Sequence, residues 1–151
     1  IVIPNYQKAR KKSRDALRVA NTLIIQEALE RYFDANRSYP TALGTLAPSY
    51  LPVLPKDPLG SATCTGLLNC NYYYAYYPAS SPTYYHLAIT LEQFTQSETP
   101  LLKDDKDCKS TGVAPACPPG ASFVDGFIGT DSAGCGTLQL PNRSCYDIVN
   151  K

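Results

Sequence analysis

Residues 5–36, NYQKARKKSRDALRVANTLIIQEALERYFDAN, contain neither proline nor glycine. Apolar and small side chains recur in this stretch at spacings of three and four residues, which predicts one amphipathic helix. Asn36 is a suitable C-terminal cap, and Tyr39-Pro40 forbids continuation. A helix of this length spans about 46 Å, longer than a small domain is wide, so part of it should project. The predicted apolar stripe comprises Leu17, Asn21, Ile24, Ala28, Tyr32 and Ala35, with Ile25 and Leu29 widening it.

The front of the predicted helix is basic and carries little of the apolar stripe, so we expect this end to project. Asp15 is the local acidic counterweight. Clusters of Lys and Arg can face anionic lipid or nucleic acid. The alternative is a solvated helix face that pairs with acidic residues of a neighbouring copy, and the near-zero net charge of the chain favours it. The cluster comprises Lys8, Arg10, Lys11, Lys12, Arg14 and Arg18.

The composition of the chain suits one globular domain. It has 151 residues, 44% hydrophobic and 18% charged, and a net charge of +1, which argues against a dedicated nucleic-acid binder. It contains no methionine, so we expect residue 1 to be a processed end or the edge of a truncated chain. We expect a single domain over 1–151, divided into a helix (1–36), a connecting αβ-loop (37–71), a β-hairpin (72–96) and a cysteine-rich region with a terminal strand (97–151).

Two tyrosine-rich stretches are typical of strands. Residues 71–77 (NYYYAYY) and 84–91 (YYHLAITL) flank a proline-containing turn and predict a hairpin, and a third strand is expected near 145–149. Alternation in the second stretch places His86 on a more polar face that we expect to be exposed. The opposite face should lie on the helix, which makes the fold α+β. That apolar face comprises Tyr85, Leu87, Ile89 and Leu91.

The segment between helix and hairpin is rich in proline and also in leucine. Such a composition predicts turns and short helical pieces rather than a flexible linker. Its apolar residues are too many for a solvated tether, so we expect them to pack over the helix or the edge of the sheet. They are Leu43, Leu46, Leu51, Val53, Leu54 and Leu59.

The six cysteines favour three disulfides and an oxidising compartment. A structural zinc site is the alternative, but the closest pair of cysteines is too widely spaced for a C-x2-C motif and the chain has one histidine. Six cysteines allow fifteen pairings. We favour the sequential one, in which each bridge closes a proline- and glycine-rich loop. The bridges are then Cys64–Cys70, Cys108–Cys117 and Cys135–Cys145.

The sequence carries no common catalytic or nucleotide-binding motif, so we expect no enzymatic activity and no catalytic residues. The run Asp104-Asp105-Lys106-Asp107 and the pair Asp125 and Asp131 offer loop carboxylates of the kind that Ca²⁺ prefers, although they do not follow the EF-hand spacing. Solvated turn residues are the favoured interpretation. The tyrosine-rich strands could stack single-stranded bases or sugars, but structural packing is favoured.

Three motifs occur in an order that resembles type IV pilins and the related pseudopilins of type II secretion. Ile1-Val-Ile-Pro-Asn-Tyr6 and the basic stretch after it resemble the segment that follows the hydrophobic N-terminal helix of that family. Residues 28–40 and 50–60, the latter with Leu54-Pro-Lys-Asp-Pro58, resemble the helix end and the following loop. Residues 72–78 resemble the first strand. The resemblance covers residues 1 to about 95.

The resemblance implies a pilin-like α+β fold, with a long N-terminal helix on a sheet of three to four antiparallel strands and a disulfide-closed C-terminal loop region. It also implies that an apolar helix precedes Ile1 and holds the subunit in the inner membrane before assembly. The implied function is a structural subunit of an extracellular type IV pilus at the cell surface, used for adhesion, twitching motility or DNA uptake. Its partners would be other copies of itself and the pilus assembly machinery, with DNA as a further candidate.

Two alternatives to a pilus subunit stay open. One is a type II secretion pseudopilin that forms a periplasmic pseudopilus, a family in which calcium is common. Against it, this chain has Asp57-Pro58-Leu59-Gly60 where major pseudopilins usually have Asp-Pro-Trp-Gly, and its tail is rich in cysteine as in pilins. By similarity, Asp125 and Asp131 are the candidate calcium ligands. The second alternative is a surface module that binds nucleic acid or glycan.

Overall fold

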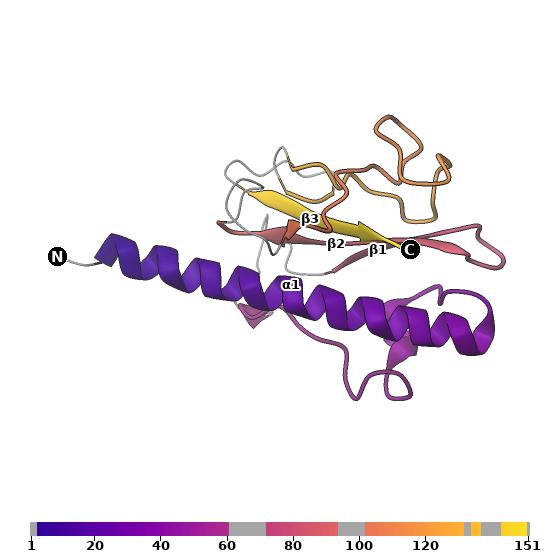
Figure 1. Cartoon of the computed structure of the whole chain (residues 1–151), viewed down its shortest axis with the longest axis horizontal. Coiled ribbons are helices and arrows are strands. Elements are labelled where there is room, and N and C mark those ends of the chain that lie inside the picture. The colour runs from indigo at the N-terminus through magenta and orange to yellow at the C-terminus, as the bar shows by residue number, and fades with distance from the viewer. Residues whose placement is uncertain (1–2, 61–71, 94–101, 132–133, 137–142, 151) are drawn as a thin grey trace.

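Helix α1 (Ile3–Asn36) lies along a three-stranded antiparallel sheet in the computed structural model. The sheet consists of β1 (Tyr73–Tyr77), β2 (Tyr84–Leu91) and β3 (Ser144–Val149), in the order β1-β2-β3 (Figure 1). The structure describes residues 3–60, 72–93, 102–131, 134–136 and 143–150. The fold is therefore α+β, with the long helix, the hairpin and the terminal strand that the sequence predicts.

The C-terminal end of α1 is stabilised by its own last residues. Arg37 adopts a left-handed conformation with φ of 59°, and its N–H donates to the Phe33 carbonyl at 2.7 Å. Asn36 donates from its side-chain amide to the Tyr32 carbonyl at 2.9 Å, which satisfies one of the carbonyls left unpaired at a helix end. The predicted helix end at Asn36 is confirmed.

Strand β2 is the centre of the sheet because it pairs with both neighbours. Tyr77 and Tyr84 form the pair that closes the β1–β2 hairpin. On the other side of β2, Leu87 pairs with Ile148 and Ala88 pairs with Asp147. This register places Leu87 and Ile148 on one face of the sheet and Ala88 and Asp147 on the other.

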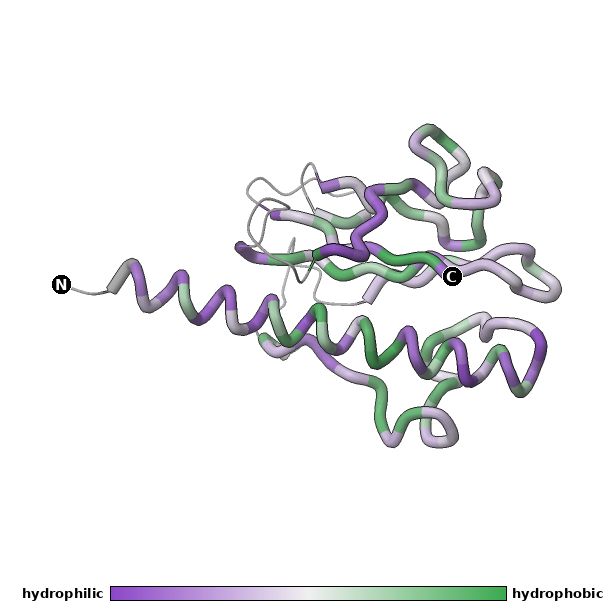
Figure 2. The backbone as a smooth tube through the Cα atoms, in the orientation of Figure 1, coloured by the Kyte–Doolittle hydropathy of each residue, from purple (hydrophilic) through white to green (hydrophobic). Residues whose placement is uncertain are grey.

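The face of the sheet toward α1 holds the larger core. Figure 2 shows hydrophobic residues in β2, in β3 and in the part of α1 that lies against the sheet. The apolar face predicted for β2 is confirmed. The α1 stripe is shifted, however, because Leu17 and Ile24 are 48% and 45% exposed. The buried row shares Ile25, Ala28 and Leu29 with the predicted stripe, and it also includes Asp15, Arg18, Val19 and Thr22.

The αβ-loop packs along α1 and around the edge of the core. The short 3-10 helix η1 (Leu43–Leu46) buries both of its leucines, and Leu51 is buried after it. The Tyr39 N–H donates to the Pro82 carbonyl at 2.7 Å, which attaches this segment to the hairpin turn. The expected packing therefore holds for these leucines but not for Val53, which is 70% exposed.

The opposite face of the sheet is covered by the irregular residues 102–131 and 134–136, which we call the loop layer. Figure 1 shows this layer and α1 on opposite sides of the sheet. Its second core contains Phe123 and Phe127, packed against Ala75 and Ala88 of the sheet. The disulfides Cys108–Cys117 and Cys135–Cys145 are present as predicted. The predicted pair Cys64–Cys70 lies outside the described residues.

His86 is buried beneath the loop layer, so its predicted exposure is wrong. Its ring stacks on Phe127 with a centroid separation of 4.0 Å. Strand alternation placed His86 correctly on the face away from α1. That face is not exposed because a segment distant in sequence covers it.

Candidate functional site

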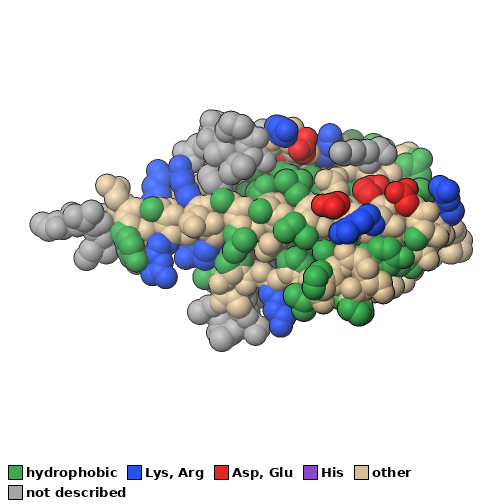
Figure 3. Space-filling model, turned by 60° about the horizontal axis from the view of Figure 1, so that its bottom comes forward, with side chains coloured by type: hydrophobic (Ala, Val, Ile, Leu, Met, Phe, Trp, Pro, Cys, Tyr) green, Lys and Arg blue, Asp and Glu red, His purple; other side chains and the backbone are tan. Residues whose placement is uncertain are grey.

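The first turns of α1 extend past the sheet and form a basic surface. Residues 5–10 are all exposed, and packing against the core begins at Asp15 and Ala16. Figure 3 shows Lys and Arg side chains grouped around this narrow end of the molecule. We call the surface the basic end and define it as Lys8, Arg10, Lys11 and Lys12.

Arg18 is only 2% exposed and does not belong to the basic end, in contrast to the sequence prediction. Its guanidinium group donates to Asp57 at 2.6 and 2.9 Å, to Asp15 at 2.7 Å and to Glu92 at 2.6 Å. Arg14 donates to both carboxylate oxygens of Glu92 at 2.8 and 2.7 Å. We call these five residues the arginine network. It joins α1, the αβ-loop and the end of β2.

The ion pairs of the arginine network shift the pKa values of Arg18 and Glu92. Burial alone would lower the pKa of Arg18, but the hydrogen bonds to Asp57, Glu92 and Asp15 outweigh it and raise the pKa above the ordinary value. Burial would raise the pKa of Glu92, but the hydrogen bonds from Arg14 and Arg18 lower it to about 2. These ion pairs hold the part of α1 next to the basic end against the αβ-loop and the end of β2.

Three aspartates lie close together in the loop layer. The side chains of Asp105, Asp107 and Asp131 each offer an oxygen within 4.8 Å of the others. The Asp131 N–H donates to Asp107 at 3.1 Å, and the Asp147 N–H of β3 donates to Asp105 at 2.9 Å. We call Asp105, Asp107 and Asp131 the carboxylate cluster.

Two buried oxygens of the carboxylate cluster, Oδ2 of Asp105 and Oδ1 of Asp131, have no hydrogen-bond partner among the residues that the structure describes. Burial and the neighbouring Asp147 raise the pKa of Asp105 to about 8, and burial and the other aspartates raise the pKa of Asp131 to about 7. Calcium takes oxygen ligands at 2.3–2.6 Å, so two ligands of one ion lie at most about 5 Å apart. The cluster meets that limit and could hold a divalent cation.

The two aspartates that similarity singles out are placed differently by the structure. Asp131 belongs to the carboxylate cluster. Asp125 is exposed in a turn with φ of 56° and is not among the three grouped carboxylates. The other two members, Asp105 and Asp107, come from the acidic run that the sequence shows as a second source of hard ligands. Their proximity to Asp131 depends on a chain path that no local pattern gives.

His86 lies between Ser110 and Asp147 in an arrangement reminiscent of a hydrolytic triad. Its Nδ1 is 2.9 Å from Ser110 Oγ and its Nε2 is 2.9 Å from Asp147 Oδ2. In serine hydrolases the serine contacts Nε2 and the aspartate contacts Nδ1, so the order is reversed here. Ser110 is also fully buried and bonded to the backbone of Phe127. This geometry favours a structural role.

The tyrosines of the strands are largely occupied by packing. On the α1 side, Tyr85 makes an edge contact with Tyr39 at 4.7 Å, and Tyr74 donates from its hydroxyl to the Pro40 carbonyl at 2.7 Å. On the loop side, Tyr73 and Tyr77 pack against Phe127 and Phe123. These contacts favour packing over a platform for bases or sugars.

Comparison with family models, with curated proteins and with solved structures finds no match for the chain. Within the described part of the chain, no helix combines the length and the apolar character needed to cross a membrane.

Proposed function

We propose that the chain is the head of a structural subunit of a type IV pilus, an extracellular helical filament at the cell surface. The observation that carries this proposal is the basic end: the first turns of α1 project from the head with exposed side chains, while the rest of α1 packs on the sheet. Because the first turns of α1 do not pack on the core of the head, this end of the helix is suited to packing against other copies. The α+β layout and the disulfides Cys108–Cys117 and Cys135–Cys145 suit a durable exposed head.

Assembly would proceed by heterologous contacts, in which one surface of a copy meets a different surface of the next and generates an open helical polymer. The basic end supplies one surface. Exposed acidic residues of the loop layer, such as Asp104 and Asp125, supply a complementary charge on a neighbouring copy. By resemblance to pilins, an apolar helix before Ile1 would hold the subunit in the inner membrane until the assembly machinery adds it to the filament.

The test is made in cells that produce the full-length protein. Surface filaments are sheared off and examined by electron microscopy with an antibody against the head. Lys8→Gln/Arg10→Gln should reduce the number of labelled filaments several-fold, because two charges of the basic end are lost. The matched control is Lys56→Gln/Lys103→Gln, which removes two exposed charges from the head. Absence of the protein from filaments would reject the proposal, and an equal effect of both pairs would reject the role of the basic end.

A pseudopilin of type II secretion is the second candidate, because two buried oxygens of the carboxylate cluster lack a hydrogen-bond partner within the described part of the chain. In this proposal Asp105, Asp107 and Asp131 bind Ca²⁺ and fasten the loop layer. A ligand at about 100 times its Kd stabilises the folded state by about 2.7 kcal/mol, which raises the Tm of a chain of this size by about 5–10 °C.

Thermal unfolding with Ca²⁺ and with EDTA tests the calcium proposal. Asp131→Asn should abolish the Ca²⁺-dependent rise in Tm, whereas Asp125→Asn, outside the cluster, should retain it. Equal Tm values in Ca²⁺ and EDTA would reject the calcium site and leave the pilus proposal in place.

A further inference from the structure

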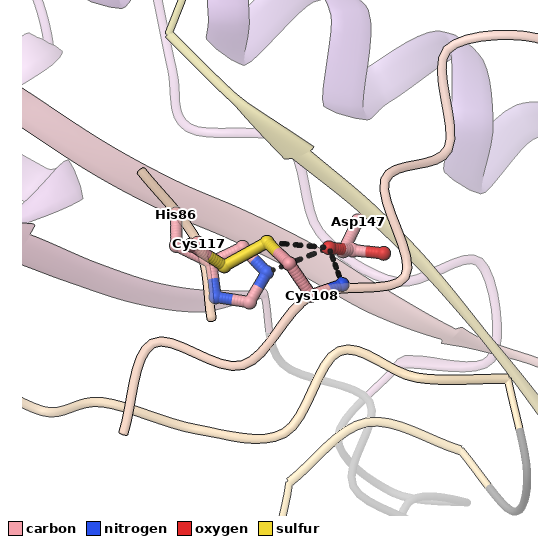
Figure 4. Close-up of side chains that lie close together, drawn as sticks. All are labelled: His86, Cys108, Cys117 and Asp147. Carbon is pink, nitrogen blue, oxygen red and sulfur yellow. Dashed lines mark hydrogen bonds and ion pairs between the residues drawn. A yellow bond between two sulfur atoms is a disulfide. The ribbon is translucent and has the colours of Figure 1, made fainter. Parts of the chain in front are cut away.

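A second group of potential metal ligands lies between the sheet and the loop layer. It consists of His86 from β2, Asp147 from β3, and Cys108 and Cys117 from the loop layer (Figure 4). One ligand atom from each residue lies within 4.8 Å of the others, and all four residues are buried. The two sulfurs are joined in a disulfide in this structure.

The donor set of this group suits zinc. Imidazole nitrogen, carboxylate oxygen and cysteine thiolate are the three ligand types of protein zinc sites, at about 2.0–2.3 Å from the metal. In a tetrahedron with these bond lengths, the ligand atoms are about 3.3–3.8 Å apart. Asp147 Oδ2 is already 2.9 Å from His86 Nε2 and 3.6 Å from Cys108 Sγ. Asp147 Oδ2 therefore already lies near this spacing from two of the other three ligand atoms.

The surroundings of His86 direct Nε2 toward the proposed metal position. Ser110 Oγ lies 2.9 Å from His86 Nδ1 and 3.2 Å from the Phe127 carbonyl, so in the tautomer with hydrogen on Nδ1 it accepts from the ring and donates to Phe127. In that tautomer the Nε2 lone pair faces Asp147 Oδ2 and a cation can bind both, whereas in the other tautomer Nε2–H donates to Asp147 and Zn²⁺ would displace that proton. A ligating histidine that gives its second N–H to a neighbouring acceptor is the usual arrangement at zinc sites. The Asp147 carboxylate is also oriented by a hydrogen bond, since its Oδ1 accepts from the Asp107 N–H at 2.8 Å.

We propose that the reduced chain binds one Zn²⁺ ion through His86 Nε2, Asp147 Oδ2 and the thiolates of Cys108 and Cys117. A dithiol reductant opens the disulfide by two thiol–disulfide exchange steps. These transfer two electrons and two protons to the protein and convert the dithiol to its own disulfide. Zinc then displaces both thiol protons, and a shared proton on Asp147 or Nε2, into solvent. The sulfurs separate from bonding distance by movement of the exposed loop 112–116 between them.

Zinc at this position would join the loop layer to the sheet, whereas the disulfide Cys108–Cys117 links two residues of the loop layer to each other. Before oxidation, that disulfide does not close the loop between Cys108 and Cys117. A zinc ion bound by residues of β2, β3 and the loop would hold that loop over His86, and the binding free energy would contribute to folding. The inference does not depend on the proposed filament function.

Cobalt is the spectroscopic probe for this site. The full chain is reduced with dithiothreitol, freed of reductant by anaerobic gel filtration and titrated with Co²⁺. We expect one Co²⁺ per chain, with visible bands of tetrahedral cobalt and a near-ultraviolet thiolate-to-cobalt band, and full displacement by one equivalent of Zn²⁺. Weak bands without the thiolate transition would place the metal on oxygen ligands, such as the carboxylate cluster, and would overturn the proposal.

Variants separate this site from the other cysteines. Cys108→Ser/Cys117→Ser should weaken Co²⁺ binding at least a hundredfold, whereas Cys135→Ser/Cys145→Ser, a pair of similar spacing, should retain it. Ser110→Ala should weaken it about tenfold by releasing the His86 ring. If the reduced wild type unfolds, circular dichroism should show that Zn²⁺ restores the helix. Failure to restore it, or loss of binding in the Cys135/Cys145 variant alone, would overturn the proposal.

Discussion

Helix α1 covers one face of the sheet with a row of closely packed side chains, whereas the loop layer covers the other face with disulfides and buried polar groups. On the helix face, Leu29 and Ile25 pack with Leu87 and Ile89 of the sheet. On the loop face, two disulfides accompany a smaller core and the buried pair His86 and Asp147. A regular helix buries apolar area through the periodicity of its side chains. An irregular segment needs specific hydrogen bonds to satisfy its backbone groups, and cross-links to hold its path.

The helix face also contains the arginine network, whose ion pairs join α1 to the αβ-loop and to the end of β2. Breaking such a network by removing its central cation leaves buried carboxylates without compensation. We therefore expect the largest loss of stability from a change in the arginine network, a smaller one from a change in the helix-face core, and a smaller one again from loss of a disulfide on the loop face.

Arg18→Ala should have the largest effect. It leaves Asp57, Asp15 and Glu92 without the guanidinium group that pairs with all three, and breaking a buried ion pair costs about 3–5 kcal/mol. Urea unfolding followed by circular dichroism measures the loss. Arg31→Ala is the control, because its side chain is 54% exposed, and it should change stability by less than about 0.5 kcal/mol. A loss below about 1 kcal/mol for Arg18→Ala would show that the network is not structurally important.

Leu87→Ala should come next. Leu87 is a fully buried residue of β2 on the face toward α1. Removing a buried leucine side chain costs about 2–5 kcal/mol, depending on how far the cavity collapses. Chemical denaturation gives the free energy of unfolding directly. Val113→Ala on the exposed part of the loop layer, at 60% exposure, should stay within about 0.5 kcal/mol of the wild type. Similar losses in both variants would remove the distinction between core and surface on which the comparison depends.

On the loop face the corresponding test is the double substitution Cys135→Ser/Cys145→Ser. This disulfide closes a loop with a sequence separation of 10, for which loop-closure entropy predicts a stabilisation of about 2–3 kcal/mol. Unfolding of the variant and of the wild type under non-reducing conditions measures the difference. A loss much smaller than 1 kcal/mol would mean that noncovalent contacts alone hold the loop layer on the sheet.

Local patterns were sufficient for the regular parts of this fold. Asn36 as a cap and the pair Tyr39-Pro40 indicated the helix end, and the tyrosine-rich stretches indicated the hairpin. The α1 stripe was misplaced because hydropathy favours Leu17 and Ile24, whereas the helix buries Arg18 and Thr22. Arg18 can be buried only because Asp57 and Glu92, far away in sequence, meet it.

Long-range contacts also explain why the site was predicted only in part. Asp131 was identified as a candidate ligand, and the acidic run that contains Asp105 and Asp107 was recognised, but nothing local shows that they lie together. His86 was assigned to the correct face, yet the loop layer that buries it is irregular and has no periodicity that would predict its path. The disulfide Cys108–Cys117 was predicted from loop composition, whereas its proximity to His86 required the folded chain.

Glu92→Gln should destabilise the protein at neutral pH by less than Arg18→Ala, because the amide oxygen can still accept a hydrogen bond from Arg18, and its difference from the wild type should shrink as the pH falls. Burial opposes the charge on Glu92, yet Arg14 and Arg18 lower its pKa from 4.5 to about 2. A carboxyl whose folded pKa is depressed stabilises the protein above its unfolded pKa and loses that contribution as pH falls through the folded value. Urea midpoints between pH 5 and pH 2 should therefore fall less steeply in Glu92→Gln than in the wild type. Glu27→Gln, with a side chain 72% exposed, should keep the wild-type slope, and equal slopes in all three proteins would show that the arginine network does not govern the acid stability of the helix face.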